Sequence, residues 1–170
     1  STVRSEAILT EAEVAQRNLP SSRLRSTSKL VGLNYEEETL DQSSSGWVVM
    51  FGSKPCAQCK LFNPLFRGVA QRITQEQQAD AESGKKSDVY AHPLKVGHFD
   101  MQVNALRSQP SPPPQGLPYI LYIPAEAASK NRTVMYRGGE RDEAVFEAWV
   151  RNVRAGGDGG QKHLEPAPPS

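Results

Sequence analysis

Residues 47–73 read WVVMFGSKPCAQCKLFNPLFRGVAQRI, and they contain the strongest indications of the fold class. It opens with five apolar residues, Trp47–Phe51, which predict a strand buried on both faces in the middle of a sheet. A turn with both cysteines of the chain, Cys56 and Cys59, comes next, and a helix that reaches at least Ile73 follows. A strand, a cysteine turn and a helix in this order form the context in which C-x-x-C is a redox motif.

The position of each cysteine predicts its role in thiol–disulfide exchange. Cys56 is expected at the N-terminus of the helix, where unpaired backbone N–H groups and the helix dipole favour a thiolate, so it is the candidate nucleophile. Cys59 lies one turn further into the helix and is placed to attack a mixed disulfide on Cys56. The alternative is that both are inert, buried residues of a redox-inactive domain.

The rest of the chain predicts an α/β domain with a mixed sheet and helices on both faces. Besides the central strand and the cysteine helix, the expected elements are a helix over Ser5–Arg17, a strand over Lys29–Leu33, a short helix over Tyr35–Leu40, strands over Leu94–Phe99, Tyr119–Ile123 and Thr133–Tyr136, a helical turn over Val103–Arg107 and a last helix over Arg141–Val153. Polar residues 75–92 are expected to form a frayed helix end and a surface loop. The proline-rich segment 109–116 can form neither a helix nor a central strand. It is interpreted as a loop in preference to the alternative, a stiff rim beside a peptide-binding groove.

Composition narrows the function. The 170 residues carry 20 basic and 19 acidic side chains, so charge recruits neither nucleic acid nor an anionic membrane. Two cysteines and three scattered histidines are too few for a disulfide framework or a zinc site, and no metal or other cofactor is expected. No apolar run approaches the roughly 18 to 20 residues that cross a bilayer, so we expect no membrane contact within this chain.

The expected organisation is one domain with tails. Residues 1–28 form an N-terminal helix and linker, residues 29–153 the folded domain, and residues 154–170, rich in Gly and Pro, a flexible tail.

The element order, together with CAQC at the head of the long helix, resembles the thioredoxin fold. Pro64 lies inside the cysteine helix, Pro118 falls where that family has a cis-proline, and Gly138 and Gly139 follow the last strand. The resemblance implies a three-layer α/β/α sandwich with a mixed central sheet, here with an extra N-terminal helix. It also implies that the backbone of Leu117, before Pro118, pairs with an extended substrate chain. The alternative is a trans proline that simply opens a strand.

Two positions depart from the thioredoxin pattern. Met50 stands where thioredoxins and protein disulfide isomerases have a buried acid that helps to move protons, and Pro55 replaces the aromatic residue usually found before the first cysteine. Both losses argue against a fast general reductase.

A narrower resemblance covers residues 14–153. The segments RNLPSSRLRSTSKLVGLNYEEETL, CAQCKLFNP, KVGHFD, LPYILYIP and YRGGERDEAVFEAWV are similar to the lumenal domain of the oxidoreductase subunit of oligosaccharyltransferase. This resemblance implies a domain in the endoplasmic reticulum lumen, part of a longer membrane protein. There it would form transient mixed disulfides with cysteine-containing unfolded polypeptides and contact other transferase subunits. An N-x-T glycosylation triplet at Asn131 agrees with a secretory compartment.

Three functions are therefore open. The first is an exchange domain that assists N-glycosylation, with Cys56 and Cys59 as catalytic residues and Leu117 and Pro118 as substrate-binding residues. The second is a redox-inactive structural subunit of a larger complex, and the third is a soluble disulfide isomerase-like enzyme.

Overall fold

The computed structural model describes residues 3–8, 26–41, 44–84, 92–110, 112–126, 130, 132–138 and 142–159. Its elements, in chain order, are β1 (Ser28–Leu30), α2 (Tyr35–Thr39), β2 (Gly46–Gly52), α3 (Ala57–Ser83), β3 (Leu94–Asp100), β4 (Tyr119–Ile123), β5 (Val134–Met135) and α4 (Glu143–Arg154). In this part of the chain, no helix is both long enough and apolar enough to cross a membrane.

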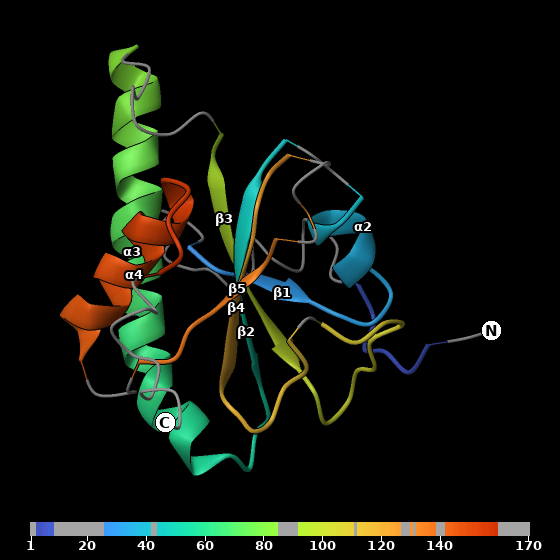
Figure 1. Ribbon diagram of the computed structural model, residues 1–170. Coiled ribbons are helices and arrows are strands. Elements are labelled where there is room, and N and C mark those ends of the chain that lie inside the picture. The colour runs from blue at the N-terminus through green and yellow to red at the C-terminus, as the bar shows by residue number, and fades with distance from the viewer. Residues whose placement is uncertain are drawn as a thin grey trace, which may run out of the picture.

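The five strands form one mixed sheet in the order β1-β3-β2-β4-β5. The first three of these run parallel to one another, whereas β4 is antiparallel to β2 and β5 is antiparallel to β4. Helices α3 and α4 cover one face of the sheet and α2 covers the other (Figure 1). The predicted α/β/α layers and mixed sheet are confirmed.

The central strand β2 separates two hydrophobic cores, because alternate side chains of a strand point to opposite faces. All seven of its residues are buried, as the apolar run predicts. Val48 and Met50 pack beneath α3 and α4, whereas Val49 and Phe51 pack on the face that α2 covers. The first core contains a cluster of aromatic rings: Phe62, Phe66, Tyr136, Phe146 and Trp149.

Helix α3 is longer than the sequence analysis predicts. The residues from Gln75 onward were expected to fray, yet the helix continues to Ser83 and ends at Gly84, which adopts the left-handed conformation with φ 70°. The Gln, Glu and Ala residues of this stretch are good helix formers, and a glycine with positive φ is a common helix stop. The Gln77 side chain also fixes this end, since it accepts from Leu94 N (2.7 Å) and donates to Leu94 O (2.9 Å).

The N-terminal segment differs from its prediction. Residues 5–8 are not helical, so the predicted start of a helix at Ser5 is wrong, and the remainder of that prediction, up to Arg17, lies outside the described residues. The segment instead bonds to the loop after β3. Ala105 N donates to Arg4 O (2.8 Å), and the buried Asn104 side chain accepts from Glu6 N (2.8 Å).

Asn104 also explains why the helical turn expected over Val103–Arg107 does not form. Its Nδ2 donates to Glu6 Oε1 and Asp100 O, and its Oδ1 also accepts from Gly32 N. These bonds join three segments around one buried amide, and the turn lies earlier, over residues 101–103. The expected strand Lys29–Leu33 likewise ends at Leu30, since residues 31–34 close a turn in which Val31 N donates to Asn34 Oδ1. Asn131 and residues 160–170 of the predicted tail lie outside the described residues.

Candidate active site at the cysteine turn and the adjoining groove

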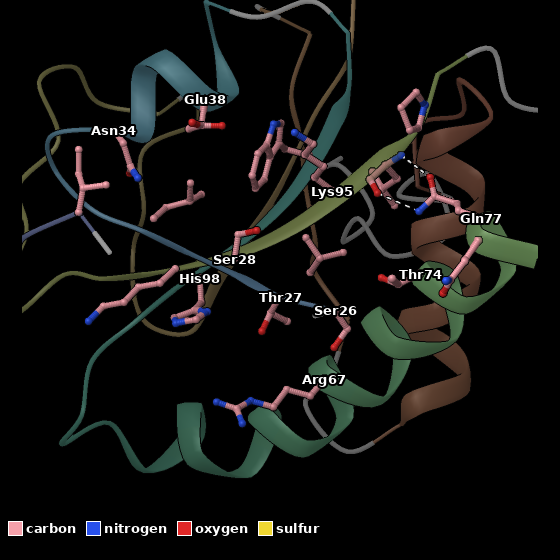
Figure 2. Close-up of a pocket in the computed structure, with 18 residues that line it drawn as sticks. Ser26, Thr27, Ser28, Asn34, Glu38, Arg67, Thr74, Gln77, Lys95 and His98 are labelled. Carbon is pink, nitrogen blue, oxygen red and sulfur yellow. Dashed lines mark hydrogen bonds between the residues drawn. The ribbon is translucent and has the colours of Figure 1, made fainter. Parts of the chain in front are cut away.

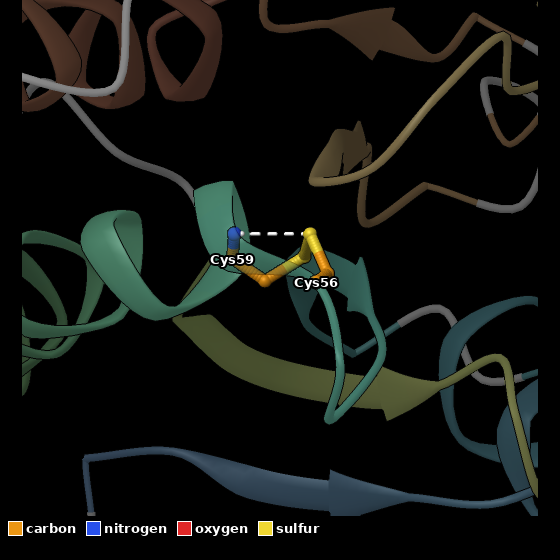
Figure 3. The surroundings of a disulfide bond; sticks show 2 residues. All are labelled: Cys56 and Cys59. Atoms are coloured by element: carbon orange, nitrogen blue, oxygen red, sulfur yellow. Dashed lines mark hydrogen bonds between the residues drawn. A yellow bond between two sulfur atoms is a disulfide. The ribbon is translucent and has the colours of Figure 1, made fainter.

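Cys56 caps the N-terminus of α3. A short loop leads from Gly52 at the end of β2 to Cys56, whose backbone is extended (φ −73°, ψ 112°), and the helix begins at the next residue. The Cys56 Sγ accepts a hydrogen bond from Cys59 N at 3.0 Å, as Figure 3 shows. This bond satisfies one of the backbone N–H groups that a helix leaves unpaired at its start.

The two cysteines form a disulfide whose Cα atoms lie 5.2 Å apart (Figure 3). Cys56 is half-buried, whereas Cys59 is only 6% exposed. An incoming thiolate therefore reaches Cys56 more easily than Cys59. This is the order of access that the sequence predicts for a nucleophile and a resolving cysteine.

The charges around the turn favour an anion at Cys56. The first turn of α3 contains no acidic residue, and the exposed side chains of Lys54 and Lys60 flank the cysteines. Backbone N–H groups at a helix start carry a partial positive charge. A thiolate on Cys56 of the reduced chain therefore meets favourable electrostatics.

The β2 residues on the face of the sheet below the disulfide are apolar. Met50 is 7% exposed and packs in the core with Phe62. Gly52 lies close to the disulfide, because a Cβ placed on it would lie 3.2 Å from Cys59 Sγ. The absence of a side chain at Gly52 thus makes room for the resolving sulfur.

A groove of about 450 Å³ lies beside the cysteine turn. The Leu117–Pro118 peptide bond is cis, as the resemblance implies, and both residues line this groove together with Gln58, which stands between the cysteines. Its other lining residues are Phe62, Gln115, Gly116, Tyr119, Ile120, Met135, Tyr136 and Gly138. The structure therefore brings the predicted substrate-binding residues and the cysteine helix to one groove.

Several groove residues have no motif of their own in the sequence. Phe62 could have been found from its spacing, since it lies three positions after Cys59 on the same side of α3. Met135 and Tyr136 come from the other end of the domain, and only the pairing of β4 with β5 brings them to the groove.

The proline-rich segment ends at the same groove. Its described residues form no helix or strand, which confirms the predicted loop. Tyr119 is buried at the start of β4, and its hydroxyl donates to Pro112 O, which joins the loop to the sheet. Burial raises the pKa of Tyr119 to about 12, so this hydroxyl keeps its proton at neutral pH.

A second pocket, of about 880 Å³, lies between β1, β3 and the middle and later turns of α3, from Arg67 to Gln78 (Figure 2). It is lined mainly by polar and charged side chains, among them Lys29, Arg67 and His98, and it contains no residue of the cysteine turn. Within the described ranges, no three His, Cys, Asp or Glu residues lie close enough to hold a metal ion. The cysteine turn and its groove therefore remain the candidate active site.

Comparisons with known proteins agree with this fold. No protein-family model matches the sequence, and the search of curated proteins found no match. Among solved structures, the Trx4 domain of ERdj5 is 20% identical with a TM-score of 0.54, over 75% of this chain and 94% of that domain. The first thioredoxin domain of mouse protein disulfide-isomerase A4 is 21% identical with a TM-score of 0.51, over 85% of this chain and 83% of that one.

Full-length ERdj5 matches 82% of this chain at 18% identity with a TM-score of 0.51, but the match covers only 17% of ERdj5. The similarity therefore spans only a small part of that longer protein. At such identities the similarity concerns the fold, and the chain has an α/β thioredoxin-like fold with a C-x-x-C disulfide.

Proposed function

We propose that the domain catalyses thiol–disulfide exchange with cysteines of extended polypeptides. The observation that carries this proposal is the Cys56–Cys59 disulfide at the start of α3. Cys56 is the more accessible of the two residues, and a groove lies beside the cysteine turn. These features are consistent with exchange chemistry, in which one sulfur is attacked and the other leaves.

Exchange at this site can run in two directions, and the first is oxidation of the substrate. A substrate thiolate attacks Cys56 Sγ, the Cys56–Cys59 bond breaks, and Cys59 leaves with the electron pair and takes up a proton. A second thiolate of the substrate then attacks the mixed disulfide, so that the substrate gains a disulfide and the domain keeps two thiols. In the reducing direction, Cys59 attacks the mixed disulfide and releases the substrate thiolate.

The groove supports an extended polypeptide as the substrate. It runs from Gln58 in the cysteine turn to the half-buried Leu117 and Pro118, and its lining mixes apolar and polar groups. Backbone pairing at Leu117 would hold a chain with little demand on its side chains. Leu117 and Pro118 are thus the proposed substrate-binding residues.

The proposed setting is the endoplasmic reticulum lumen, where the domain would assist N-glycosylation by oligosaccharyltransferase as part of a longer membrane protein. The sequence segments that are similar to the transferase's oxidoreductase subunit support this setting, and so does the likeness of fold to a domain of a protein disulfide-isomerase. A mixed disulfide would delay folding of the nascent chain, which keeps nearby asparagines accessible.

The test measures glycosylation in cells whose full-length protein carries both substitutions, Cys56→Ser and Cys59→Ser. Occupancy of acceptor sites flanked by cysteines is expected to fall severalfold, and sites in cysteine-free substrates serve as the matched control. If all cysteine-flanked sites stayed fully occupied, the proposed role would be wrong.

The second candidate function is that of a redox-inactive structural subunit. Met50 and Pro55, which replace residues typical of fast exchange enzymes, favour this alternative. It predicts that the serine variant assembles and functions normally. The third candidate, a soluble disulfide isomerase, instead predicts rapid turnover of small disulfide substrates by the isolated domain.

A further inference from the structure

Asp100 is the last residue of β3 and lies beside Gly52 of β2, which is close to the buried sulfur of Cys59. In the parallel pairing of β2 with β3, Asp100 is in register with Gly52. Neighbouring strands lie about 4.8 Å apart. Since a Cβ on Gly52 would lie 3.2 Å from Cys59 Sγ, and Gly52 has no side chain of its own, no β2 side chain separates Asp100 from that sulfur.

Asp100 belongs to the same face of the sheet as α3. Val96 packs in the core beneath α3, and Phe99 packs in the opposite core, so the alternation of β3 directs His98 and Asp100 toward α3. The Asp100 charge acts to raise the pKa of His98, which agrees with both groups facing the same side. Asp100 is therefore a half-buried carboxylate on the side of the sheet where Cys59 lies.

The orientation of this carboxylate is fixed by one bond. Its Oδ1 accepts from Gln102 N at 2.9 Å. Within the described part of the chain, Oδ2 makes no further hydrogen bond. One oxygen thus holds the side chain in place, and the other can receive a proton.

No other group on the two strands beneath the disulfide is as well placed. The β2 side chains on this face are Val48 and Met50, which cannot accept a proton. His98 is in register with Met50, two residues further from Cys59 along the strand. Figure 2 shows His98 in the pocket that Arg67 also lines, and burial, together with the charges of Arg67 and Lys29, lowers the pKa of His98.

The charged groups that act on His98, besides Asp100, are Arg67 of α3, Lys29 of β1 and Glu6 of the N-terminal segment. Further out, Arg4 donates to Met101 O, next to Asp100, and the charge of Lys54 acts on Glu6.

We propose that Asp100 is the proton acceptor for Cys59 during resolution of the mixed disulfide. This inference rests on the proposed exchange function and adds a residue to it. The Asp100 carboxylate takes the Cys59 thiol proton, directly or through one water, as Cys59 Sγ bonds to Cys56 Sγ. The bond from Cys56 to the substrate sulfur breaks, the substrate leaves as a thiolate with the electron pair, and Asp100 later returns its proton to solvent.

The test separates the two thiols by mixing the reduced chain with one equivalent of a chromogenic aromatic disulfide. Attack by Cys56 releases the first coloured thiolate, and resolution by Cys59 releases the second. Asp100→Asn keeps an oxygen that can accept from Gln102 N but removes the base. General-base catalysis typically contributes about 10²- to 10⁴-fold, so the second step is expected to slow at least tenfold at pH 7 while the first is unchanged. The difference should vanish at a pH where Cys59 ionises unaided.

His98→Gln is the matched control, and it is expected to leave both steps unchanged. The proposal is overturned if Asp100→Asn resolves at the wild-type rate across the pH range, or if His98→Gln slows the second step instead. A wild-type chain that releases no second thiolate would refute the exchange function itself, and this inference with it.

A measurement on the wild-type chain covers the case in which the variant does not fold. At one neutral pH, the NMR chemical shift of the Asp100 carboxyl carbon should differ between the reduced and oxidised chains, because the Cys59 thiol is present beside it only in the reduced chain. The carboxyl carbon of Asp142, which caps α4 by accepting from Val145 N, should keep the same chemical shift in both. Identical Asp100 chemical shifts in the two states would overturn the proposal.

Discussion

Cys56→Ser is expected to abolish exchange with a disulfide-bonded or dithiol peptide. A serine hydroxyl cannot replace the outer sulfur, which is both the capping atom of α3 and the more accessible half of the disulfide. The loss should be about a thousandfold or more in rate, equivalent to at least about 4 kcal/mol of transition-state stabilisation. The measurement is the exchange rate of the reduced domain with a fluorogenic peptide disulfide.

Cys59→Ser is the informative control for this prediction. It leaves the outer thiol in place but removes the buried one, so attack continues and the mixed disulfide accumulates in place of released peptide. If Cys56→Ser retained the wild-type rate, or if Cys59→Ser alone formed no mixed disulfide, the assignment of nucleophile and resolving cysteine would be wrong.

Phe146→Ala is expected to cause a large loss of stability. Phe146 is 1% exposed and its ring contacts those of Phe62, Phe66, Tyr136 and Trp149, with a T-shaped pair to Phe62 at 5.0 Å. Removing a buried phenylalanine side chain leaves a cavity and typically costs about 3 to 5 kcal/mol. This is a large part of the roughly 5 to 15 kcal/mol that stabilises an ordinary domain.

The measurement is denaturant unfolding with the disulfide in the same state in both proteins. Val145→Ala is the matched control, since the neighbouring side chain is 42% exposed and its removal should change the free energy of unfolding by less than about 1 kcal/mol. Equal effects of the two substitutions would mean that α4 does not pack on the sheet through Phe146.

The sequence predicts the central part of the fold because its signals there are local. The run before the cysteine turn and the YILYI run have the composition of buried strands, and both strands lie where they are expected. The end of α3 is predicted less well, because its last residues are polar and exposed, so they lack the apolar periodicity that marks an amphipathic helix. Helix propensity, the Gly84 stop and the Gln77 bonds to Leu94 extend it beyond that periodicity.

The residues of the candidate site also form two groups: those that a local motif predicts and those that only strand pairing brings together. Cys56, Cys59 and Pro118 belong to short motifs with known spacing, so their roles could be proposed before the structure was known. The contact of Cys59 with Gly52, and the register that sets Asp100 beside Gly52, depend on pairing between strands that are distant in sequence. A one-residue shift of that register would turn Asp100 away from α3, and nothing local in the sequence specifies it.

The most direct test of a working exchange site is a redox titration of the purified chain in glutathione buffers. Alkylation of Cys56 and Cys59 would be read separately by mass spectrometry. We expect a reversible two-electron transition in which Cys56 is alkylated faster than Cys59, because it is the more accessible thiol at the helix N-terminus. Two thiols that stay unreactive until the protein unfolds would contradict the exchange function and leave a structural domain.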